Sequence, residues 1–326
     1  MDNHNSESPA AQRPWQPDCL GGDFVQTVVE QPRDYAGQVI TTVVKTKPAS
    51  ARPAVALLYV HGFSDYFFQK EMARMFADNG YAFYAVDLRK YGRSLLPGQK
   101  MFQVRDLREY FEDIDAAIDI IKSDGFDSVV ILGHSTGGLT SSLYMAEKPQ
   151  PVVKALMLNS PFLDWNLPWL QRTLLVPLVS AVGRFFPSIK VRQTPDAGYA
   201  ETLSARHSGE WCYNEAWKPD ILPDPDAGWV RAVNKAQKAL RRSKICVPVL
   251  LMFSADSVRK GDDREKYFRA DAILDVRAIS RYGRRLGKHV TEVAFDGGLH
   301  DLALSRPDVR NAFYRTMLQW LRKQGL

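Results

Sequence analysis

The chain has 326 residues, a formal net charge of +6 at pH 7, 45% hydrophobic and 25% charged residues. This balance excludes a disordered or fibrous protein, and the length fits one large α/β unit that carries an insertion. The three cysteines are odd in number and form no CxxC pair, which predicts neither a disulfide framework nor a zinc site. We therefore expect no metal, and a reducing compartment fits best.

The first residues and the charge bear on location. Residues 1–20 have the composition of a flexible tail and lack the basic and apolar regions of a secretory signal, so the expected location is cytoplasmic. The longest apolar stretch, 173–183, is shorter than the ~20 residues that span a bilayer, so at most transient contact with a membrane surface is expected. The basic residues gather late in the chain. We interpret them as a solvated basic face, with attraction to anionic lipid or an anionic acyl carrier as the alternative. No nucleic-acid recognition motif accompanies them.

In chain order, two β-branched runs come first. "FVQTVVEQ" and "GQVITTVVKT", joined by "PRDYAG", predict an antiparallel hairpin. Short apolar runs of the kind buried on both faces of a parallel sheet follow at 54–60, 82–87, 128–133, 154–160 and 247–254. Helical patterns separate most of them, and a last strand, "HVTEVAFD", precedes a final helix over 307–323. The alternation predicts an α/β fold with a doubly wound, mostly parallel sheet and helices on both faces.

One interval lacks any buried-strand run and is rich in Trp, Leu and Phe. We expect a helical cap (lid) over 161–245, inserted into a core made of 21–160 and 246–326. The alternative is a packing subdomain that never meets substrate. Trp165, Trp169 and Trp211 are the candidates for a substrate pocket. A stripe at helical spacing is expected either to pack inward or to line the pocket; it consists of Leu167, Leu170, Leu174, Leu178, Val182 and Phe185.

The corner "VVILGHSTGG" carries the clearest chemistry. It places Ser135 between a buried-type strand and a helix, with Gly133 and Gly137 at the positions where a sharp turn leaves no room for side chains. A serine hydroxyl needs such exposure, a base and oxyanion donors to act as a nucleophile. Ser135 also excludes an aspartate nucleophile, and Leu139 stands where a phosphate-binding P-loop would need lysine. We therefore predict Ser135 as nucleophile.

The partners of Ser135 should come from other strand ends. Of the six histidines, only His300 follows a strand in the last connection, and it is the predicted base. Asp256 lies just past the strand at 247–254, on the carboxyl edge where ligands bind in open α/β sheets, and is the predicted acid. "HGF" after the strand at 54–60 predicts that the backbone N–H of Phe63, with that of Thr136, forms an oxyanion hole.

The segments "HGFSDY", "DLRKYGRS", "GHSTGG", "NSPFLD", "SADSV" and "GGLHD" together resemble the α/β-hydrolase superfamily. The resemblance is to the serine hydrolases grouped with monoacylglycerol lipases and S33 aminopeptidase-like proteins. It implies an α/β-hydrolase fold, Ser135, Asp256 and His300 as catalytic triad, Phe63 and Thr136 as oxyanion donors, and no cofactor.

The resulting hypothesis is a serine esterase or lipase-like hydrolase that forms an acyl-enzyme and acts on a small, apolar ester. Two alternatives stay open. An aminopeptidase or amidase uses the same triad and needs an acidic pocket, for which Glu201, Glu210 and Glu215 are available. A non-catalytic binding protein on the same scaffold is the other. The oligomeric state is left undetermined.

Overall fold

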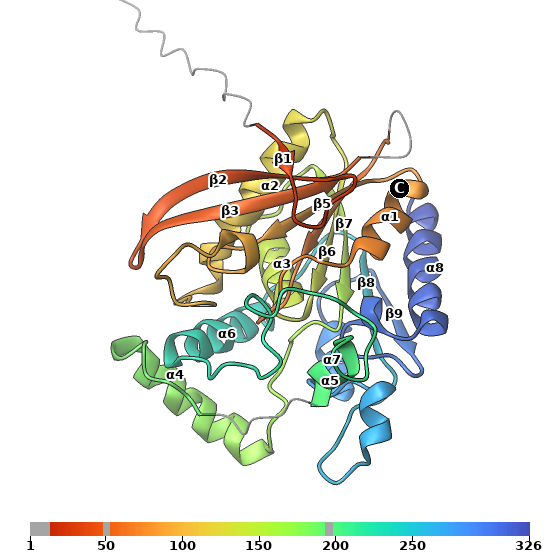
Figure 1. The fold of residues 1–326 in the computed structure, drawn as a ribbon. Helices are drawn as coiled ribbons and strands as arrows, with labels where there is room; N and C mark the ends of the chain where they lie inside the picture. The colour runs from red at the N-terminus through yellow and green to blue at the C-terminus, as the bar shows by residue number, and fades with distance from the viewer. Residues whose placement is uncertain (1–13, 48–52, 193–197) are drawn as a thin grey trace, which may run out of the picture.

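Nine strands form one sheet in the computed structural model, which describes residues 14–47, 53–192 and 198–326 (Figure 1). The strands are β1 (Gln16–Pro17), β2 (Phe24–Asp34), β3 (Gly37–Thr46), β4 (Ala56–Val60), β5 (Ala82–Asp87), β6 (Val129–His134), β7 (Val153–Asn159), β8 (Val249–Ser254) and β9 (Val290–Phe295). Their order in the sheet is β1-β2-β3-β5-β4-β6-β7-β8-β9. Neighbours from β5 to β9 are parallel and β1 to β3 pair antiparallel, which confirms the predicted mostly parallel sheet with an N-terminal hairpin.

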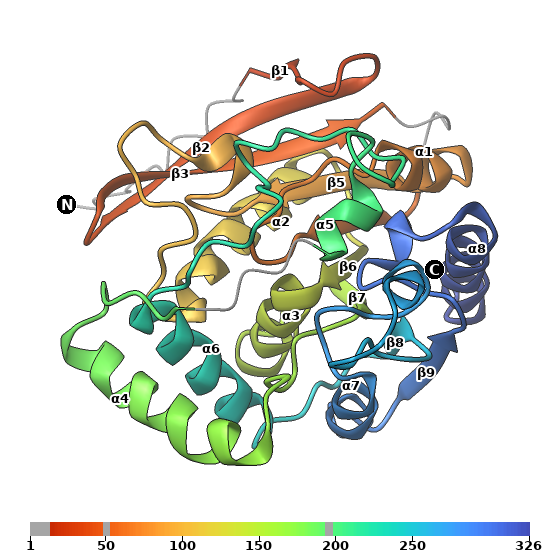
Figure 2. The same cartoon turned by 60° about the horizontal axis from the view of Figure 1, so that its bottom comes forward.

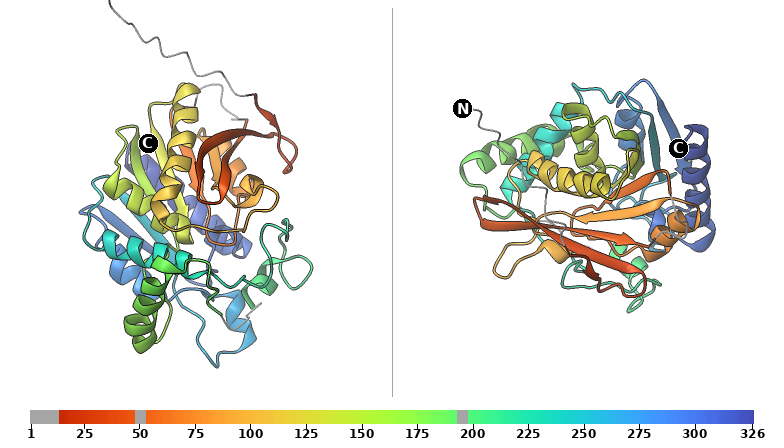
Figure 3. Two further views of the ribbon diagram at one scale, coloured as in Figure 1. Left: turned by 90° about the vertical axis from the view of Figure 1, so that its left-hand side faces the viewer. Right: turned by 90° about the horizontal axis from the view of Figure 1, so that it is seen from above.

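Helices cover both faces of the parallel strands, as Figures 1 and 3 show. The helices are α1 (Lys70–Asp78), α2 (Phe111–Ser123), α3 (Ser135–Glu147), α4 (Val176–Phe185), α5 (Gly198–Leu203), α6 (Ala227–Leu240), α7 (Val276–Gly283) and α8 (Pro307–Lys323). Short 3₁₀ turns lie at Gly92–Ser94, Leu107–Tyr110, Arg264–Phe268 and Leu302–Leu304, and a π-helical turn at Gln171–Leu175.

Alternate residues of the central strands point into two separate apolar cores. On β4, Leu58 and Val60 pack with the buried faces of α2, α3 and α6. Leu57 and Tyr59 pack with α1 and α8 on the opposite face. Because both faces are covered, a strand such as β4 is apolar at every position, which is why a continuous apolar run predicted it.

The expected tail at 1–20 is corrected in part. Residues 1–13 lie outside the described residues, but Gln16 and Pro17 pair with Gln26 and Val25 of β2. The next residue, Asp18, is buried, and its carboxylate accepts bonds of 2.6 and 2.9 Å from the guanidinium of Arg93. A bidentate pair of this kind fixes the backbone at 16–18, so this part is not a free tail.

The chain between β7 and β8 contains the π-helical turn, α4, α5 and α6. The buried face of α6 joins the main core, and α4 lies outside α6, at the edge of the molecule (Figures 1 and 2). The two helices approach closely because residue 183 is glycine: a Cβ there would lie 2.1 Å from the carbonyl oxygen of Ala227. The separation of this region from the core as a cap stays a prediction. Among the described helices, none combines the length and apolarity needed to cross a membrane.

The prediction that the apolar stripe packs inward or lines the pocket is wrong for most of its residues. Only Leu167 lines the cavity described below. The other members, Leu170, Leu174, Leu178, Val182 and Phe185, are exposed to solvent. Helical spacing shows that a face is apolar, but it cannot show what that face meets.

Candidate active site

The site lies at the carboxyl ends of the parallel strands. Ser135 follows β6, His300 follows β9, and the turn at Gly62 and Phe63 follows β4. Parallel strands bring their carboxyl ends to one edge of the sheet, so residues far apart in sequence meet there.

The turn at Ser135 is tight and strained. Ser135 has φ of +53°, a conformation that side-chain-bearing residues rarely adopt. A Cβ at Gly133 would lie 2.8 Å from the carbonyl oxygen of Gly137, and a Cβ at Gly137 would lie 2.2 Å from that of His61. These two positions therefore accept only glycine, and the resulting corner projects the Ser135 hydroxyl beyond the end of β6.

A chain of hydrogen bonds joins three buried side chains. Ser135 Oγ lies 3.0 Å from Nε2 of His300, and Nδ1 of His300 lies 2.9 Å from Oδ2 of Asp271. The other oxygen of Asp271 accepts from the backbone N–H groups of Ile273 and Leu274, each at 2.8 Å. Since a carboxylate accepts, Nδ1 carries the proton, which leaves Nε2 free to accept from the serine hydroxyl.

The prediction of Asp256 as the acid is wrong. The structure brings Ser135 and His300 together, but the side chain of Asp256 is 52% exposed and forms an ion pair with Lys266 at 2.9 Å. The hydrogen bond from Lys266 lowers the pKa of this carboxyl. Asp256 therefore lies at the surface, and it is not the carboxylate bonded to His300.

A loop excursion explains the displacement. The chain leaves the sheet edge after Asp256, runs through a charged segment at 258–270 and returns, so that the backbone N–H of Asp271 donates to the carbonyl of Asp256 at 2.9 Å. The returning carboxylate is the one that faces His300. One signal in the sequence could have found it: Asp271 stands among Ala270, Ala272 and Ile273, whereas charged residues crowd the segment before it.

Two further histidines are buried nearby and have structural partners. Nδ1 of His61 donates to the carbonyl of Gly62 at 2.8 Å, while its Nε2 accepts from the N–H of Leu88 at 3.1 Å. His134 donates from Nδ1 to the carbonyl of Asn159 at 3.1 Å, and burial lowers its pKa. Neither ring is placed as a base for Ser135.

Asp301 also turns away from its neighbour His300. Its two carboxylate oxygens accept from Asn159 at 2.7 Å and from Gln69 at 3.0 Å. The backbone N–H of Asp301 donates to the hydroxyl of Tyr199, whose ring packs edge-on against His300. These contacts fix the loop that carries the histidine.

Phe63 and Thr136 line the same cavity as Ser135, which is where the oxyanion prediction needs them. Thr136 belongs to the first turn of α3, where backbone N–H groups have no helical acceptor. The bond from His61 fixes the direction of the Gly62 carbonyl and therefore the orientation of the peptide plane between Gly62 and Phe63. In a trans peptide the following N–H, that of Phe63, points opposite to this carbonyl. Gly62 itself abuts the serine, since a Cβ there would lie 3.0 Å from that of Ser135.

A cavity of about 600 Å³ opens over Ser135 and His300. One part of its wall is apolar and comes from Phe63, Phe162, Trp165, Leu167, Val176, Val179, Leu222, Trp229 and Ile273. The polar part includes Asp65, Arg192, Tyr199, Tyr213, Lys218 and Asp220. Burial favours the neutral form of Asp65, but Lys218, 2.9 Å away, and the nearby His134 and His61 together outweigh it and lower the pKa of that carboxyl.

Of the three tryptophans predicted for the pocket, the structure places only Trp165 there. Trp169 is 69% exposed on the outer surface. Trp211 packs against the cluster that contains Leu304, and its ring N–H donates to the carbonyl of that residue at 2.9 Å. Trp229, which was not predicted for the pocket, also lines the cavity; it lies in the first turn of α6 and packs against Phe63 with ring centroids 4.4 Å apart. Its position near the nucleophile became visible only with the fold.

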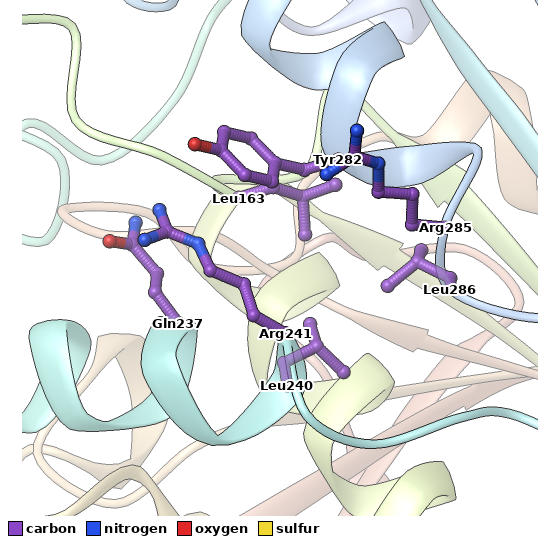
Figure 4. A pocket seen from close by; sticks show the side chains of 7 residues that line it. All are labelled: Leu163, Gln237, Leu240, Arg241, Tyr282, Arg285 and Leu286. Carbon is purple, nitrogen blue, oxygen red and sulfur yellow. The ribbon is translucent and has the colours of Figure 1, made fainter.

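A smaller cavity of about 100 Å³ lies apart, between α6 and the end of α7 (Figure 4). Arg241, at its wall, forms an ion pair with Asp164 at 2.5 Å and stacks over Tyr282. None of the residues that line it belongs to the hydrogen-bond chain of Ser135.

Comparison with known proteins identifies the family of the chain. The model of a hydrolase family described as Serine aminopeptidase, S33 matches residues 51–304. The chain belongs to this family. Among curated proteins, this S33 family member is 32% identical over 118 residues to phospholipase YtpA of Bacillus subtilis, which covers 36% of the chain and 44% of that protein. It is 30% identical over 115 residues to mouse epoxide hydrolase 4, covering 35% of the chain and 30% of that protein. The chain thus matches less than half the length of these relatives.

Solved structures share the fold of the S33 family member. A monoacylglycerol lipase of Paleococcus ferrophilus superposes with a TM-score of 0.62 at 19% identity, over 92% of this chain and 99% of that one. A thermostable carboxyl esterase of Bacillus coagulans superposes with a TM-score of 0.64 at 14% identity, over 92% and 99% of the two chains. These likenesses confirm the α/β-hydrolase fold.

Proposed function

We propose that the protein is a serine hydrolase that cleaves carboxylic esters with an apolar acyl or alkyl group. The observation that carries the proposal is the buried hydrogen-bond chain from Ser135 through His300 to Asp271. It gives a hydroxyl, a base that can accept its proton, and a carboxylate that holds the base in the required tautomer.

In the proposed mechanism, Nε2 of His300 takes the hydroxyl proton as Ser135 Oγ forms a bond to the ester carbonyl carbon. The carbonyl oxygen becomes an oxyanion, which accepts hydrogen bonds from the backbone N–H groups of Phe63 and Thr136. The ester C–O bond then breaks, and His300 gives its proton to the leaving alcohol. Water, deprotonated by His300, attacks the acyl-enzyme, and the carboxylic acid leaves as Ser135 regains its proton. Asp271 stabilises the imidazolium in both steps.

The walls of the cavity support an apolar substrate. Phe162, Trp165 and Val179 offer aromatic and aliphatic surface to an acyl or alkyl chain. Burying each methylene of such a chain contributes about 0.8 kcal/mol, so chains of about four to twelve carbons should bind better than acetate. The similarity to a protein named as a phospholipase also favours a lipid-like ester.

The aminopeptidase alternative needs a carboxylate free to meet a substrate amine. In the described part of the cavity wall, Asp65 is paired with Lys218, and Asp220 with His207 and Arg206. The three acids expected to serve this role do not line the cavity. Each forms an ion pair elsewhere: Glu201 with Arg264, Glu210 with Arg310, and Glu215 with Arg206. Because these carboxylates are already paired, their arrangement favours ester substrates over peptides with a free amino terminus.

A panel of p-nitrophenyl esters from two to twelve carbons, together with alanine p-nitroanilide, tests the proposal. We expect an optimum between four and twelve carbons for the wild type and loss of hydrolysis in Ser135→Ala. Ser142→Ala is the matched control, because this buried serine of the same helix does not line the cavity. Faster cleavage of the anilide than of the butyrate would contradict the proposal. Hydrolysis that survives Ser135→Ala would do the same, and no hydrolysis at all would favour a binding protein.

A further inference from the structure

The outer side of α4 and the segments next to it is unusually apolar. Of the fourteen exposed large hydrophobic side chains in the described residues, ten lie between 167 and 189. We call these ten the α4 face: Leu167, Trp169, Leu170, Leu174, Leu175, Leu178, Val182, Phe185, Phe186 and Ile189. Trp169 and Phe185 are 69% and 71% exposed. Exposed apolar residues that are scattered singly are normal on a protein surface, but a cluster of this size marks an interaction surface.

The helix buries one side and exposes apolar residues on the other. Val176, Ser180 and Gly183 are buried, whereas Leu178 and Phe185, together with Leu174 of the preceding π-helical turn, are exposed. Figures 1 and 2 show α4 as an outermost element, with α6 between it and α3. A soluble surface helix would carry polar residues on this outer side.

The charge of the same segment has one sign. No Asp or Glu occurs from residue 165 to 195, while Arg172, Arg184, Lys190 and Arg192 do. Arg172 reaches back to Asp164, and the charged end of Arg184 lies near the ring of Phe185. An apolar surface whose own segment carries cationic but no acidic residues complements a bilayer with anionic headgroups, and its tryptophan and phenylalanines suit the interfacial region.

The α4 face is continuous with the candidate active site. Leu167 and Leu175 are partly exposed on this face and also line the cavity over Ser135. Val176, Val179 and Arg192, from the same segment, line it too. One wall of the cavity is therefore the inner side of the element whose outer side is apolar. A bilayer seated on the outer side would lie next to the route into the cavity.

We propose that the α4 face docks the protein peripherally on anionic lipid bilayers, and that acyl substrates enter the cavity from the bilayer past this segment. The docking does not depend on the catalytic chemistry. The delivery of substrate rests on the ester hydrolase activity proposed above.

Sedimentation with vesicles tests the docking. The full chain carrying Ser135→Ala, which cannot turn over lipid, is mixed with vesicles of phosphatidylcholine alone or with about one third phosphatidylglycerol. We expect at least about tenfold tighter binding to the anionic vesicles at low salt, weakened by added salt. Adding Leu174→Ser, Leu178→Ser and Phe185→Ser to this chain should weaken the binding at least about a hundredfold, because three apolar anchors are lost. Adding Val28→Ser, at an exposed valine of β2, is the matched control and should leave binding unchanged.

The triple substitution is also made in the otherwise wild-type chain. None of the three side chains lines the cavity, so hydrolysis of a soluble short ester should stay within about twofold of wild type. Absence of vesicle binding, or equal binding with and without the triple substitution, would overturn the proposal. A dimer that the triple substitution dissociates, without vesicle binding, would overturn it in favour of self-association. Because binding is measured on the inactive chain, failure of docking is distinguishable from failure of the esterase activity.

Discussion

Oδ2 of Asp271 lies 2.9 Å from Nδ1 of His300, and this carboxylate is fully buried. Its other oxygen is held by two backbone N–H groups, so the carboxylate cannot rotate away without losing both bonds. The arrangement sets the tautomer and the orientation of the imidazole that faces Ser135.

Asp271→Asn should lower kcat by about 10⁴-fold, because an amide at this position favours the wrong histidine tautomer. Asp256→Asn is the matched control, one loop excursion away on the surface, and should change kcat by less than about threefold. Steady-state kinetics on p-nitrophenyl butyrate measure both. A larger loss in Asp256→Asn than in Asp271→Asn would contradict the assignment.

The fold was largely predictable because its signals are local. The runs that predicted β4 to β8 are apolar because both faces of these strands are covered, and the Ser135 corner shows its glycines within five residues. His300 followed from being the histidine after the last strand. Asp271 could not be found in the same way. The rule that an acid follows its strand directly fails when the chain makes an excursion at 258–270 before it returns to the sheet edge.

The environment of α4 could not be predicted from the local sequence either. Residues such as Leu174 and Leu178 have the spacing of a core-facing helix, and nothing in that spacing tells core from solvent or from a membrane. Trp165 and Trp169 are four residues apart, yet only the first reaches the cavity. Such distinctions depend on where the whole helix is placed.

His61→Gln tests the peptide plane that presents the N–H of Phe63. A glutamine cannot reproduce both bonds of the ring, so the carbonyl of Gly62 loses its fixed direction. We expect kcat to fall about 10²-fold, as when one oxyanion donor is lost, with a smaller change in KM. The melting temperature is recorded alongside. An unchanged kcat in a folded variant would show that His61 has no positioning role.

His134 should make stability depend on pH. Burial lowers the pKa of this histidine in the folded protein, so the unfolded chain takes up its proton at a higher pH than the folded chain does. Acidification from about pH 7 toward pH 5 therefore favours unfolding, and the effect levels off below the folded-state pKa. Melting temperatures of wild type and His134→Gln across this range should diverge, with the smaller decrease in the variant. Parallel curves would be inconsistent with this cause.

Trp165→Ala should change chain-length preference. Removing this ring from the cavity wall should lower kcat/KM for octanoate relative to acetate by about tenfold. Trp169→Ala, tested on the same dissolved esters, should leave the ratio unchanged because its ring lies outside the cavity. Equal effects of the two substitutions would indicate that the chain binds elsewhere.

The role of Ser135 as the nucleophile is tested most directly by reaction with a fluorophosphonate. The intact mass of the protein is measured afterwards, and the modified peptide is mapped. We expect one adduct per wild-type chain, located on Ser135, and none in Ser135→Ala. Labelling of another residue, or an adduct that persists in Ser135→Ala, would contradict this role.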